Sequence, residues 1–382
     1  MPGISFLKSG TQTLERELNS MRIKAVNSII FVTYRCTSRC NTCNIWKWAD
    51  EKLTGPKDGE LTAEKFEYMV EKLYRFGVGT VEIFGGDALL RKDIVYSILK
   101  RCTGLGLDSY FPTNSNLLDQ ETAQRLVSGG LDTIYFSIDG INELHDRIRG
   151  VKGTFIRAKE AIWNIYKARS QFRAKKPEIG IITTVSNMNV EIIEELLSEI
   201  QNFPVDFVYL QALGEVSQED IEHSIIDGIR ATPPFISTAK NTHLLSETQF
   251  NLLTDTLKRL KKKRNKFQFD LRLSHIEPLK MDTLTRGVFP AFPCHICTTV
   301  ATLRPSGEVV PCPYFTDFTL GSLEKADSLG HIWGNAKHRL FIKKQRRGEF
   351  AVCRKCSMRH FYPGIRETFR QVFFPYIYTL SF

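Results

Sequence analysis

The sequence of 382 residues lacks any long apolar run. A helix that crosses a bilayer needs about 18 or more consecutive apolar residues, and no stretch of the chain comes near that length. The first ten residues include Lys8 and have no apolar centre, so no secretory signal is visible. Internal repeats and low-complexity segments are also missing. We therefore exclude membrane-spanning, secreted and fibrous proteins and expect a cytoplasmic one.

The composition is that of a folded protein. Hydrophobic residues make up 42% of the chain and charged residues 25%, which is too apolar and too evenly charged for a disordered chain. The length fits two to three domain-sized units, or one large α/β domain with an extension.

The positive charge is concentrated in two short runs. The formal net charge is +10, and residues 258–266 hold seven basic side chains while residues 337–347 hold six. Neither run contains an acid. Such a run can attract a phosphate, a nucleic acid or an anionic membrane surface, but a solvated helix face is the more ordinary interpretation and the one we favour.

The nine cysteines fall into two groups and one isolated residue. Clustered cysteines in a reducing compartment bind metal or perform redox chemistry more often than they form disulfides. Cys102 continues an apolar helix stripe, so we expect it in the core. The two groups are Cys36, Cys40 and Cys43, and Cys294, Cys297, Cys312, Cys353 and Cys356.

Strand and helix patterns alternate from residue 28 to residue 213 and predict an α/β fold. Apolar runs indicate strands at 28–32, 80–84, 109–112, 133–137, 179–185 and 206–210, with helical spacing between them. Six parallel strands are too few for a closed barrel of eight, so we predict an open, partial (β/α)6 barrel. Ligands of such sheets sit at the carboxyl ends of the strands.

Beyond this core the pattern loses its regularity. We expect a helix over 247–266, a strand over 267–273 and a small iron–sulfur or zinc module rich in Cys, Pro and Gly. The predicted segments are an N-terminal extension (1–27), the barrel (28–213), a linking, substrate-shaping segment (214–290), the C-terminal module (291–362) and an aromatic tail (363–382). The tail is expected to pack on the body or on a partner, with a peripheral membrane contact as the alternative.

The first cysteine group directly follows the first predicted strand, which places its thiols at the ligand-binding edge of the sheet. Three thiolates at CxxxCxxC spacing can hold an iron–sulfur cube and leave one iron open, whereas a complete all-cysteine site needs four. An open position is what a reactive metal site requires. A structural zinc site and plain buried cysteines are the alternatives.

CxxxCxxC after the first strand resembles the radical S-adenosylmethionine (radical SAM) superfamily. Two further stretches carry the resemblance in the right order: residues 84–90, Phe-Gly-Gly-Asp-Ala-Leu-Leu, and residues 137–150, from Ser-Ile-Asp-Gly to His-Asp-Arg-Ile-Arg-Gly. The resemblance covers roughly residues 28–213. It implies a [4Fe–4S] cluster held by the three cysteines, with S-adenosylmethionine at its open iron.

The resemblance also implies a set of cofactor-binding residues. The glycine pair brings the backbone close to the ligand's ammonium group, serine and aspartate bond ribose hydroxyls, arginine pairs with a carboxylate, and the last glutamine borders the adenine. The residues are Gly85, Gly86, Asp87, Asn114, Ser137, Asp139, Arg149 and Gln211.

Two positions depart from the family pattern. Thr42 stands before the third cysteine, where many members have an aromatic residue, so stacking on adenine is in question. Asp87-Ala88 replaces the family's Glu-Pro after the glycine pair, which keeps the charge on a shorter side chain.

The second cysteine group surrounds a predicted hairpin. Residues 303–310 turn at Ser306-Gly307 and bring Cys312 back beside Cys294 and Cys297. Spacing alone suits zinc and iron–sulfur equally. The arrangement resembles the SPASM/twitch extensions of radical SAM enzymes, which implies an auxiliary [4Fe–4S] cluster. Five cysteines then compete for about four positions, and Cys294 and Cys297 both lie within the family's spacing.

The resemblance implies reductive cleavage of S-adenosylmethionine to a 5′-deoxyadenosyl radical, which takes hydrogen from a substrate. The resemblance also implies a reducing partner such as flavodoxin or ferredoxin. It further implies an oxidation or rearrangement of the substrate that the auxiliary cluster aids. Only about 27 residues precede the first strand, so we expect no leader-binding domain and favour a sugar, cyclitol or other small metabolite as substrate. Peptide modification is the alternative, and a nucleic-acid-binding iron–sulfur or zinc protein is the alternative of another class.

Overall fold

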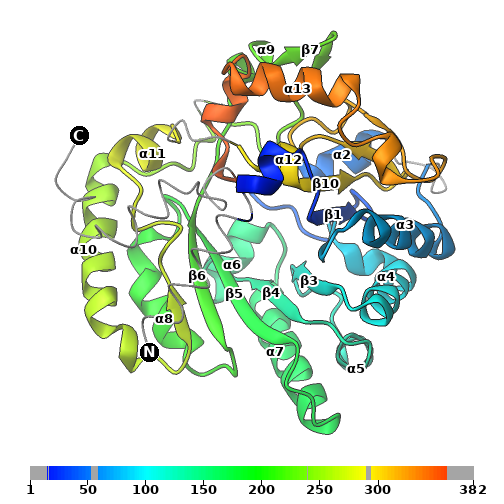
Figure 1. The fold of residues 1–382 in the computed structure, drawn as a ribbon. Coiled ribbons are helices and arrows are strands. Elements are labelled where there is room, and N and C mark those ends of the chain that lie inside the picture. The colour runs from blue at the N-terminus through cyan, green and yellow to red at the C-terminus, as the bar shows by residue number, and fades with distance from the viewer. Residues whose placement is uncertain (1–14, 16, 53–58, 239, 290–293, 359–382) are drawn as a thin grey trace.

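The fold is built on one curved sheet of ten strands, with helices along its outer side (Figure 1). The computed structural model describes residues 15, 17–52, 59–238, 240–289 and 294–358. The strand order is β12-β11-β10-β1-β2-β3-β4-β5-β6-β9.

The six predicted strands are all present, in sequence order and parallel. They are β1 (Asn27–Phe31), β2 (Thr80–Phe84), β3 (Asp108–Thr113), β4 (Thr133–Ser137), β5 (Glu178–Val185) and β6 (Phe207–Ala212). The sheet continues at both edges, because β9 (Asp270–Arg272) pairs with β6 and β10 (Val300–Leu303) pairs with β1, both in parallel. The strand expected over 267–273 is therefore present but shorter.

The crossover helices cover the outer side of the strands, as the helical spacing predicts (Figure 1). Their apolar stripes form the main core with one face of each strand, and Cys102 is fully buried there, which confirms its expected place. The helices are α3 (Ala63–Phe76), η1 (Ala88–Arg91), α4 (Lys92–Leu105), α5 (Gln120–Ser128), α6 (Asn142–Arg149), α7 (Thr154–Gln171), η2 (Val190–Ile192) and α8 (Ile193–Ile200).

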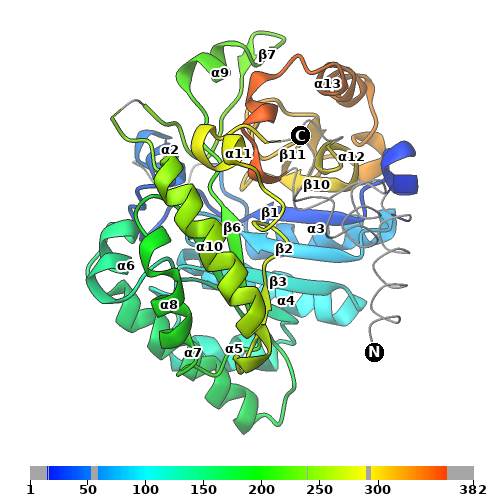
Figure 2. The same ribbon diagram turned by 90° about the vertical axis from the view of Figure 1, so that its left-hand side faces the viewer.

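The segment after β6 occupies two places: in Figure 2, α10 passes in front of the β6 edge of the sheet, while α9 and β7 lie at the top of the molecule. The helix predicted over 247–266 is present as α10 with a short η3. The elements are α9 (Gln218–Glu222), β7 (Ile225–Ile226), β8 (Ile229–Arg230), α10 (Glu247–Lys263), η3 (Arg264–Lys266) and α11 (Met281–Arg286).

The C-terminal module shares the main sheet. The predicted hairpin is present: β10 turns through Gly307, with a φ of 78°, into the antiparallel β11, and β12 adds to it. The second basic run folds into α13, a helix that the sequence analysis had treated only as a charge pattern. Besides β10, the elements of the module are α12 (Ile296–Thr299), β11 (Glu308–Val310), β12 (Gly321–Ser322), η4 (Leu329–His331), α13 (Ala336–Arg346) and η5 (Ala351–Arg354). Helix α2 (Ile45–Lys52) is not part of the module and follows the first cysteine group in the sequence.

Within the described residues, no helix is both long and apolar enough to cross a bilayer. The aromatic tail expected over 363–382, and its packing or membrane contact, lie outside the described residues.

Phe111 on β3 tests the core. Its ring is fully buried between the sheet and the outer helices, so Phe111→Ala leaves a cavity and is expected to lower the free energy of unfolding by about 3–5 kcal/mol. Tyr74→Ala on α3 is the control, because that ring is 45% exposed, and it should change stability by less than about 0.5 kcal/mol. Chemical denaturation followed by circular dichroism measures both. Equal losses would show that the β3 ring is not a core anchor.

Candidate active site at the ends of the parallel strands

The loop that carries Cys36, Cys40 and Cys43 follows β1 and is fastened to the end of α6. The backbone N–H of Arg39 donates to the Arg149 carbonyl at 2.9 Å, and that of Asn41 donates to the Ile148 carbonyl at 2.9 Å. These carbonyls lack partners within the helix, so the loop caps the helix end. Gly150 ends α6 with a φ of 69°, and a Cβ there would overlap with the Arg39 carbonyl.

The glycine pair after β2 lies against the start of the same loop. Gly86 N–H donates to the Thr33 carbonyl at 3.0 Å, and Asp87 N–H donates to the Arg35 carbonyl at 2.8 Å. A Cβ on Gly86 would overlap with the Arg35 carbonyl. Packing within the chain therefore requires glycine at this position. The sequence suggested a different reason, namely close approach of the backbone to a ligand.

Asp87 joins the ends of β1 and β2 instead of facing open space. Its carboxylate accepts a hydrogen bond from the Thr37 hydroxyl in the cysteine loop, and its other oxygen accepts one from Leu89 N–H at 3.2 Å, which caps η1. Burial raises the pKa of the Asp87 carboxyl above its usual range, although the Thr37 bond opposes the shift. The shorter side chain thus serves to hold the cysteine loop.

Asn114, after β3, contacts the cysteine loop directly. Its amide donates to the Thr37 hydroxyl at 3.1 Å and lies 3.7 Å from the Cys36 sulfur. Asn116 donates to Thr37 at 3.0 Å and to the Ser38 hydroxyl at 3.1 Å. Asn116 and Thr37 were not predicted from the sequence, although Asn116 stands in the same polar run at the end of β3.

The three thiols lie close enough for their charges to affect one another. Burial raises the pKa of Cys36 to about 11 and that of Cys43 to about 12, and the neighbouring Cys40 thiolate adds to both shifts. Buried thiols of this kind ionise when a bound cation compensates the charge.

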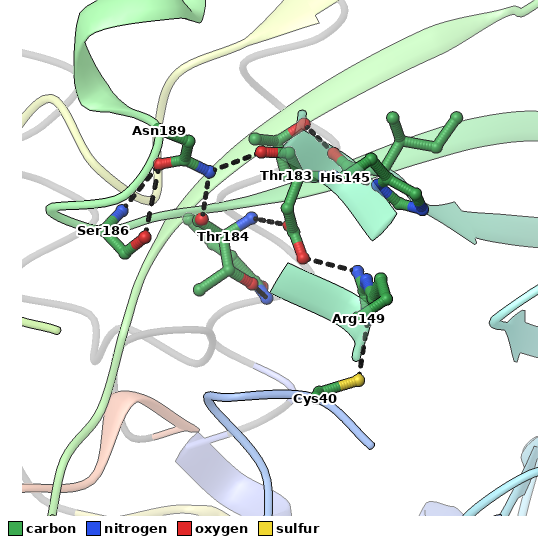
Figure 3. A network of polar contacts seen from close by, with 10 residues as sticks. Cys40, His145, Arg149, Thr183, Thr184, Ser186 and Asn189 are labelled. Atoms are coloured by element: carbon green, nitrogen blue, oxygen red, sulfur yellow. Dashed lines mark hydrogen bonds and ion pairs between the residues drawn. The ribbon is translucent and has the colours of Figure 1, made fainter. Parts of the chain in front are cut away.

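Asp139 and Arg149 form a buried ion pair beside Cys40 (Figure 3). The Asp139 carboxylate lies 2.6 Å from an Arg149 guanidinium nitrogen, and another nitrogen of the same group lies 3.8 Å from the Cys40 sulfur. Burial alone would lower the pKa of Arg149, but the charges of Asp139 and Cys40 raise it above its usual value. The family resemblance predicts separate ligand contacts for these two residues, whereas in the structure they pair with each other.

Hydrogen bonds extend from Asp139 across the next two strands. Thr184 N–H donates to the Asp139 carboxylate at 2.8 Å, and the Gln211 amide donates to the Thr184 hydroxyl at 3.0 Å. The predicted residues from Cys40 to Gln211 are thereby brought together at one edge. Ser137 ends β4, and its hydroxyl makes no hydrogen bond within the described part of the chain.

Two residues behind Asp139 were missed. Asn189 donates to the Asp139 carbonyl at 2.8 Å, and Asp139 N–H donates to His145 Nδ1 at 3.2 Å (Figure 3). Burial lowers the pKa of His145 to about 3, so its ring is neutral and can accept this bond. The His-Asp-Arg sequence of α6 offered a signal for His145; Asn189 lies in a loop without one.

The second cysteine group gathers around the β10–β11 hairpin. The Cys297 thiol donates to the Cys294 carbonyl at 3.6 Å, and the charges of Cys294, Cys353 and Cys356 all act on Cys312. Burial raises the pKa of Cys312 well above its usual value. Among the described residues, no three His, Cys, Asp or Glu side chains are grouped tightly enough to hold a single metal ion.

Tyr314 and His338 support this second group. Tyr314 N–H donates to the Cys312 sulfur at 3.4 Å, and the buried Tyr314 hydroxyl bonds the Cys356 sulfur. His338 on α13 is fully buried, and its Nε2 lies 2.7 Å from the Cys297 carbonyl. Neither residue was singled out in the sequence.

Comparison with protein families identifies both cysteine-bearing regions. Residues 30–200 match the model of the radical SAM superfamily, and residues 294–357 match SPASM, an iron–sulfur cluster-binding domain. A radical SAM domain implies a [4Fe–4S] cluster and S-adenosylmethionine, and a SPASM domain implies auxiliary iron–sulfur clusters.

Curated relatives are distant and differ in how much they share. The tungsten-containing aldehyde ferredoxin oxidoreductase cofactor-modifying protein of Pyrococcus furiosus is 25% identical, over 86% of this chain and 86% of its own length. The AdoMet-dependent heme synthase of Oleidesulfovibrio alaskensis is 28% identical, over 45% of this chain and 41% of its own. The match thus spans less than half of the heme synthase.

Solved structures show the same fold. Native anSMEcpe with bound AdoMet is 16% identical with a TM-score of 0.61, and the match covers 93% of this chain and 98% of that one. Streptococcus suis SuiB bound to its precursor peptide SuiA is 15% identical with a TM-score of 0.59, covering 87% and 71%. At these identities the likeness establishes the architecture alone.

Gly150→Ala tests whether the loop fastening supports the first site. Alanine adds backbone strain of about 1–2 kcal/mol at this φ and pushes the Arg39 carbonyl away, so we expect iron content after reconstitution to fall by about half. Gly106→Ala is a matched control, because Gly106 ends α4 with a φ of 69° but has nothing within 4 Å. Full iron in both variants would contradict the fastening; iron lost equally in both would assign the loss to backbone strain.

Proposed function

We propose that Cys36, Cys40 and Cys43 hold the cluster that cleaves S-adenosylmethionine. The chain belongs to the radical SAM superfamily and carries a SPASM iron–sulfur domain. The observation that carries this is the unbroken series of contacts at one sheet edge from Cys40 through Arg149, Asp139 and Thr184 to Gln211. It joins a cysteine loop to the polar strand ends that a bound cofactor would face.

The residues present fit the implied groups. Three thiols share a loop, and the buried Arg149 Nε has no hydrogen-bond partner among the described residues. A carboxylate is the natural acceptor for a guanidinium N–H. A bound methionine carboxylate would accept a hydrogen bond from that nitrogen and add to the compensation of the guanidinium charge that Asp139 and Cys40 provide.

Iron–sulfur clusters held by the two cysteine groups would supply the one-electron chemistry that reductive cleavage of S-adenosylmethionine and oxidation of a substrate need. The chain's part is positioning. We assign carboxylate binding to Arg149, ribose contacts to Ser137 and Asp139, the adenine border to Gln211, and ammonium contacts to the carbonyls of Gly85 and Gly86.

Asp87 and Asn114 belong to this proposal as loop-holding residues. Both reach Thr37 between the first two cysteines, so they fix the spacing of the thiols relative to the ends of β2 and β3. A ligand set held on rigid strand ends keeps a reactive group in one geometry.

For the second site we assign ligands from Cys294, Cys297, Cys312, Cys353 and Cys356. The first two lie three residues apart, and the Cys297 thiol donates to the Cys294 backbone carbonyl. Either of the two can stand in the set while the other remains a thiol. We propose an oxidation or rearrangement as the outcome, because an auxiliary cluster beside the core can accept the substrate's electron.

We propose a small organic molecule, such as a sugar, cyclitol or other metabolite, as the substrate. The relative that covers 86% of both chains is named for modifying a cofactor, which supports a small substrate. A peptide is the second candidate, favoured by the fold shared with SuiB, which was solved with its precursor peptide. Assays with both substrate classes separate them.

Cys40→Ala tests the first assignment. Without this ligand the cluster is lost, so formation of 5′-deoxyadenosine with dithionite should fall to background, while the wild type binds about eight irons per chain. Cys102→Ala is the control, because Cys102 is buried in the core away from both groups and its loss should leave cleavage intact. The measurement is anaerobic reconstitution, iron and sulfide analysis, and chromatography of the nucleoside. Cleavage by the Cys40 variant would refute the assignment.

Tyr314→Phe tests the second. A hydrogen bond to a thiolate ligand stabilises the more negative, reduced cluster, so its removal should lower the midpoint potential of one cluster and leave iron content unchanged. Spectroelectrochemical titration followed by electron paramagnetic resonance reports both potentials. Unchanged potentials with full iron would remove Cys356 from the ligand set.

A further inference from the structure

The two basic runs of the chain have opposite surroundings. The run on α10 and η3 is largely neutralised by acids. Five of its seven basic residues form ion pairs within the described residues: Lys258 with Asp255, Arg259 and Lys263 with Glu194, Lys261 with Glu277, and Arg264 with Asp270. It is a solvated face, as the sequence analysis favoured.

The run on α13 keeps most of its charge free. Lys344 pairs with Glu349, which also reaches Arg347 just past the helix. The remaining basic residues are exposed, and no acid of the described residues pairs with them. They are Lys337, Arg339, Lys343 and Arg346.

Apart from Lys337, the free charges of α13 lie on one side. Arg339, Lys343 and Arg346 follow one another at spacings of four and three residues, which places them along a single helix face together with Arg347. The buried residues, His338 and Phe341 among them, occupy the other face. We call the exposed set of Arg339, Lys343, Arg346 and Arg347 the α13 stripe.

The buried face of α13 rests on the second cysteine group. His338 Nε2 lies 2.7 Å from the carbonyl of Cys297, and Figure 1 shows α13 above α12 and β10. A helix with its side chains is about 10–12 Å across. A protein docked on the α13 stripe would therefore be separated from the Cys297 backbone by about one helix.

We propose that the α13 stripe is the docking surface for a small acidic one-electron carrier protein of the ferredoxin or flavodoxin class. The stripe supplies the charge complementarity that steers a transient partner, and its helix supplies the short path to the second cysteine group. The inference rests on the proposed function, which gives that group a cluster.

The electron balance gives such a carrier a role. Cleavage of S-adenosylmethionine consumes one electron, which a reduced carrier docked on the stripe supplies and is thereby oxidised by one electron. The substrate loses a hydrogen atom to the 5′-deoxyadenosyl radical and then one electron from the resulting radical, and an oxidised carrier docked in the same place takes up that electron and is reduced by one electron.

Neighbouring acids limit the docking surface on one side. Glu349 follows α13, and α9 carries the exposed Glu219 and Glu222. The end of α9 lies next to the segment after α13, because Ala351 N–H donates to the His223 carbonyl. The carrier's acidic patch is accordingly expected to meet the middle of α13, around Lys343.

The test compares two double charge reversals of equal size. Lys343→Glu/Arg346→Glu alters the α13 stripe, and Lys262→Glu/Lys266→Glu alters exposed residues of the other basic run, which have no ion pair in the described structure. Affinity for an acidic [2Fe–2S] ferredoxin, and separately for a flavodoxin, is measured by titration calorimetry on reconstituted protein at low and high salt.

We expect the α13 variant to bind the carrier about tenfold more weakly at low salt, and the control to change by less than about twofold. High salt should remove most of the difference. Lys343→Gln/Arg346→Gln should give an intermediate loss, which guards against misfolding of the reversed helix.

The proposal is wrong if neither carrier binds the wild type measurably, or if both reversed variants lose equal affinity. It is also wrong if the α13 variant loses binding to heparin and RNA but still binds the carrier, which would assign the stripe to nucleic acid. Cleavage of S-adenosylmethionine with dithionite is measured in parallel. Dithionite is a small reductant that needs no docking surface. If the wild type cleaves S-adenosylmethionine with dithionite but does not bind a carrier, only the docking proposal is rejected. If the wild type does not cleave S-adenosylmethionine with dithionite, the proposed function is rejected.

Discussion

The buried ion pair between Asp139 and Arg149 is the interaction on which the edge of the sheet depends. Two charges removed from water are stable only when their geometry and hydrogen bonds compensate the desolvation. Here Thr184 N–H bonds the carboxylate and the Cys40 sulfur lies beside the guanidinium, so three parts of the chain share one charge network. The end of α6 that carries Arg149 also fastens the cysteine loop through its carbonyls. Any ligand at this edge must compete with, or join, that network.

The sequence predicted the fold well because its signals were local and repeated. Apolar runs such as 80–84 and helix stripes such as the one through Cys102 each reflect a single period, and parallel order follows from their alternation. The edge strands were harder. The residues of β10 predict one strand of a local hairpin. They do not indicate that the other side of β10 pairs with β1, where the partners Ser28 and Ala301 are 273 residues apart in the sequence.

At the candidate site the residue types were predictable, whereas their partners were not. Position near a strand end identified Asp87, Asp139 and Arg149 as candidates, and each was predicted to contact a ligand. In the structure each of them contacts another part of the chain. Asn189 and His338 act through backbone carbonyls from distant segments, and such bonds leave no spacing pattern in a sequence. The basic runs looked alike until their acidic neighbours on other elements were known.

The pairing of β10 with β1 has a consequence for how the chain is made. β1 is among the first strands to leave the ribosome, yet one of its two edges stays open until the segment around residue 300 has been synthesised. An open edge strand is a template for pairing with other chains. The nascent barrel must therefore be protected through most of translation, and a chain stopped short of β10 would keep that edge exposed instead of forming a smaller, complete enzyme.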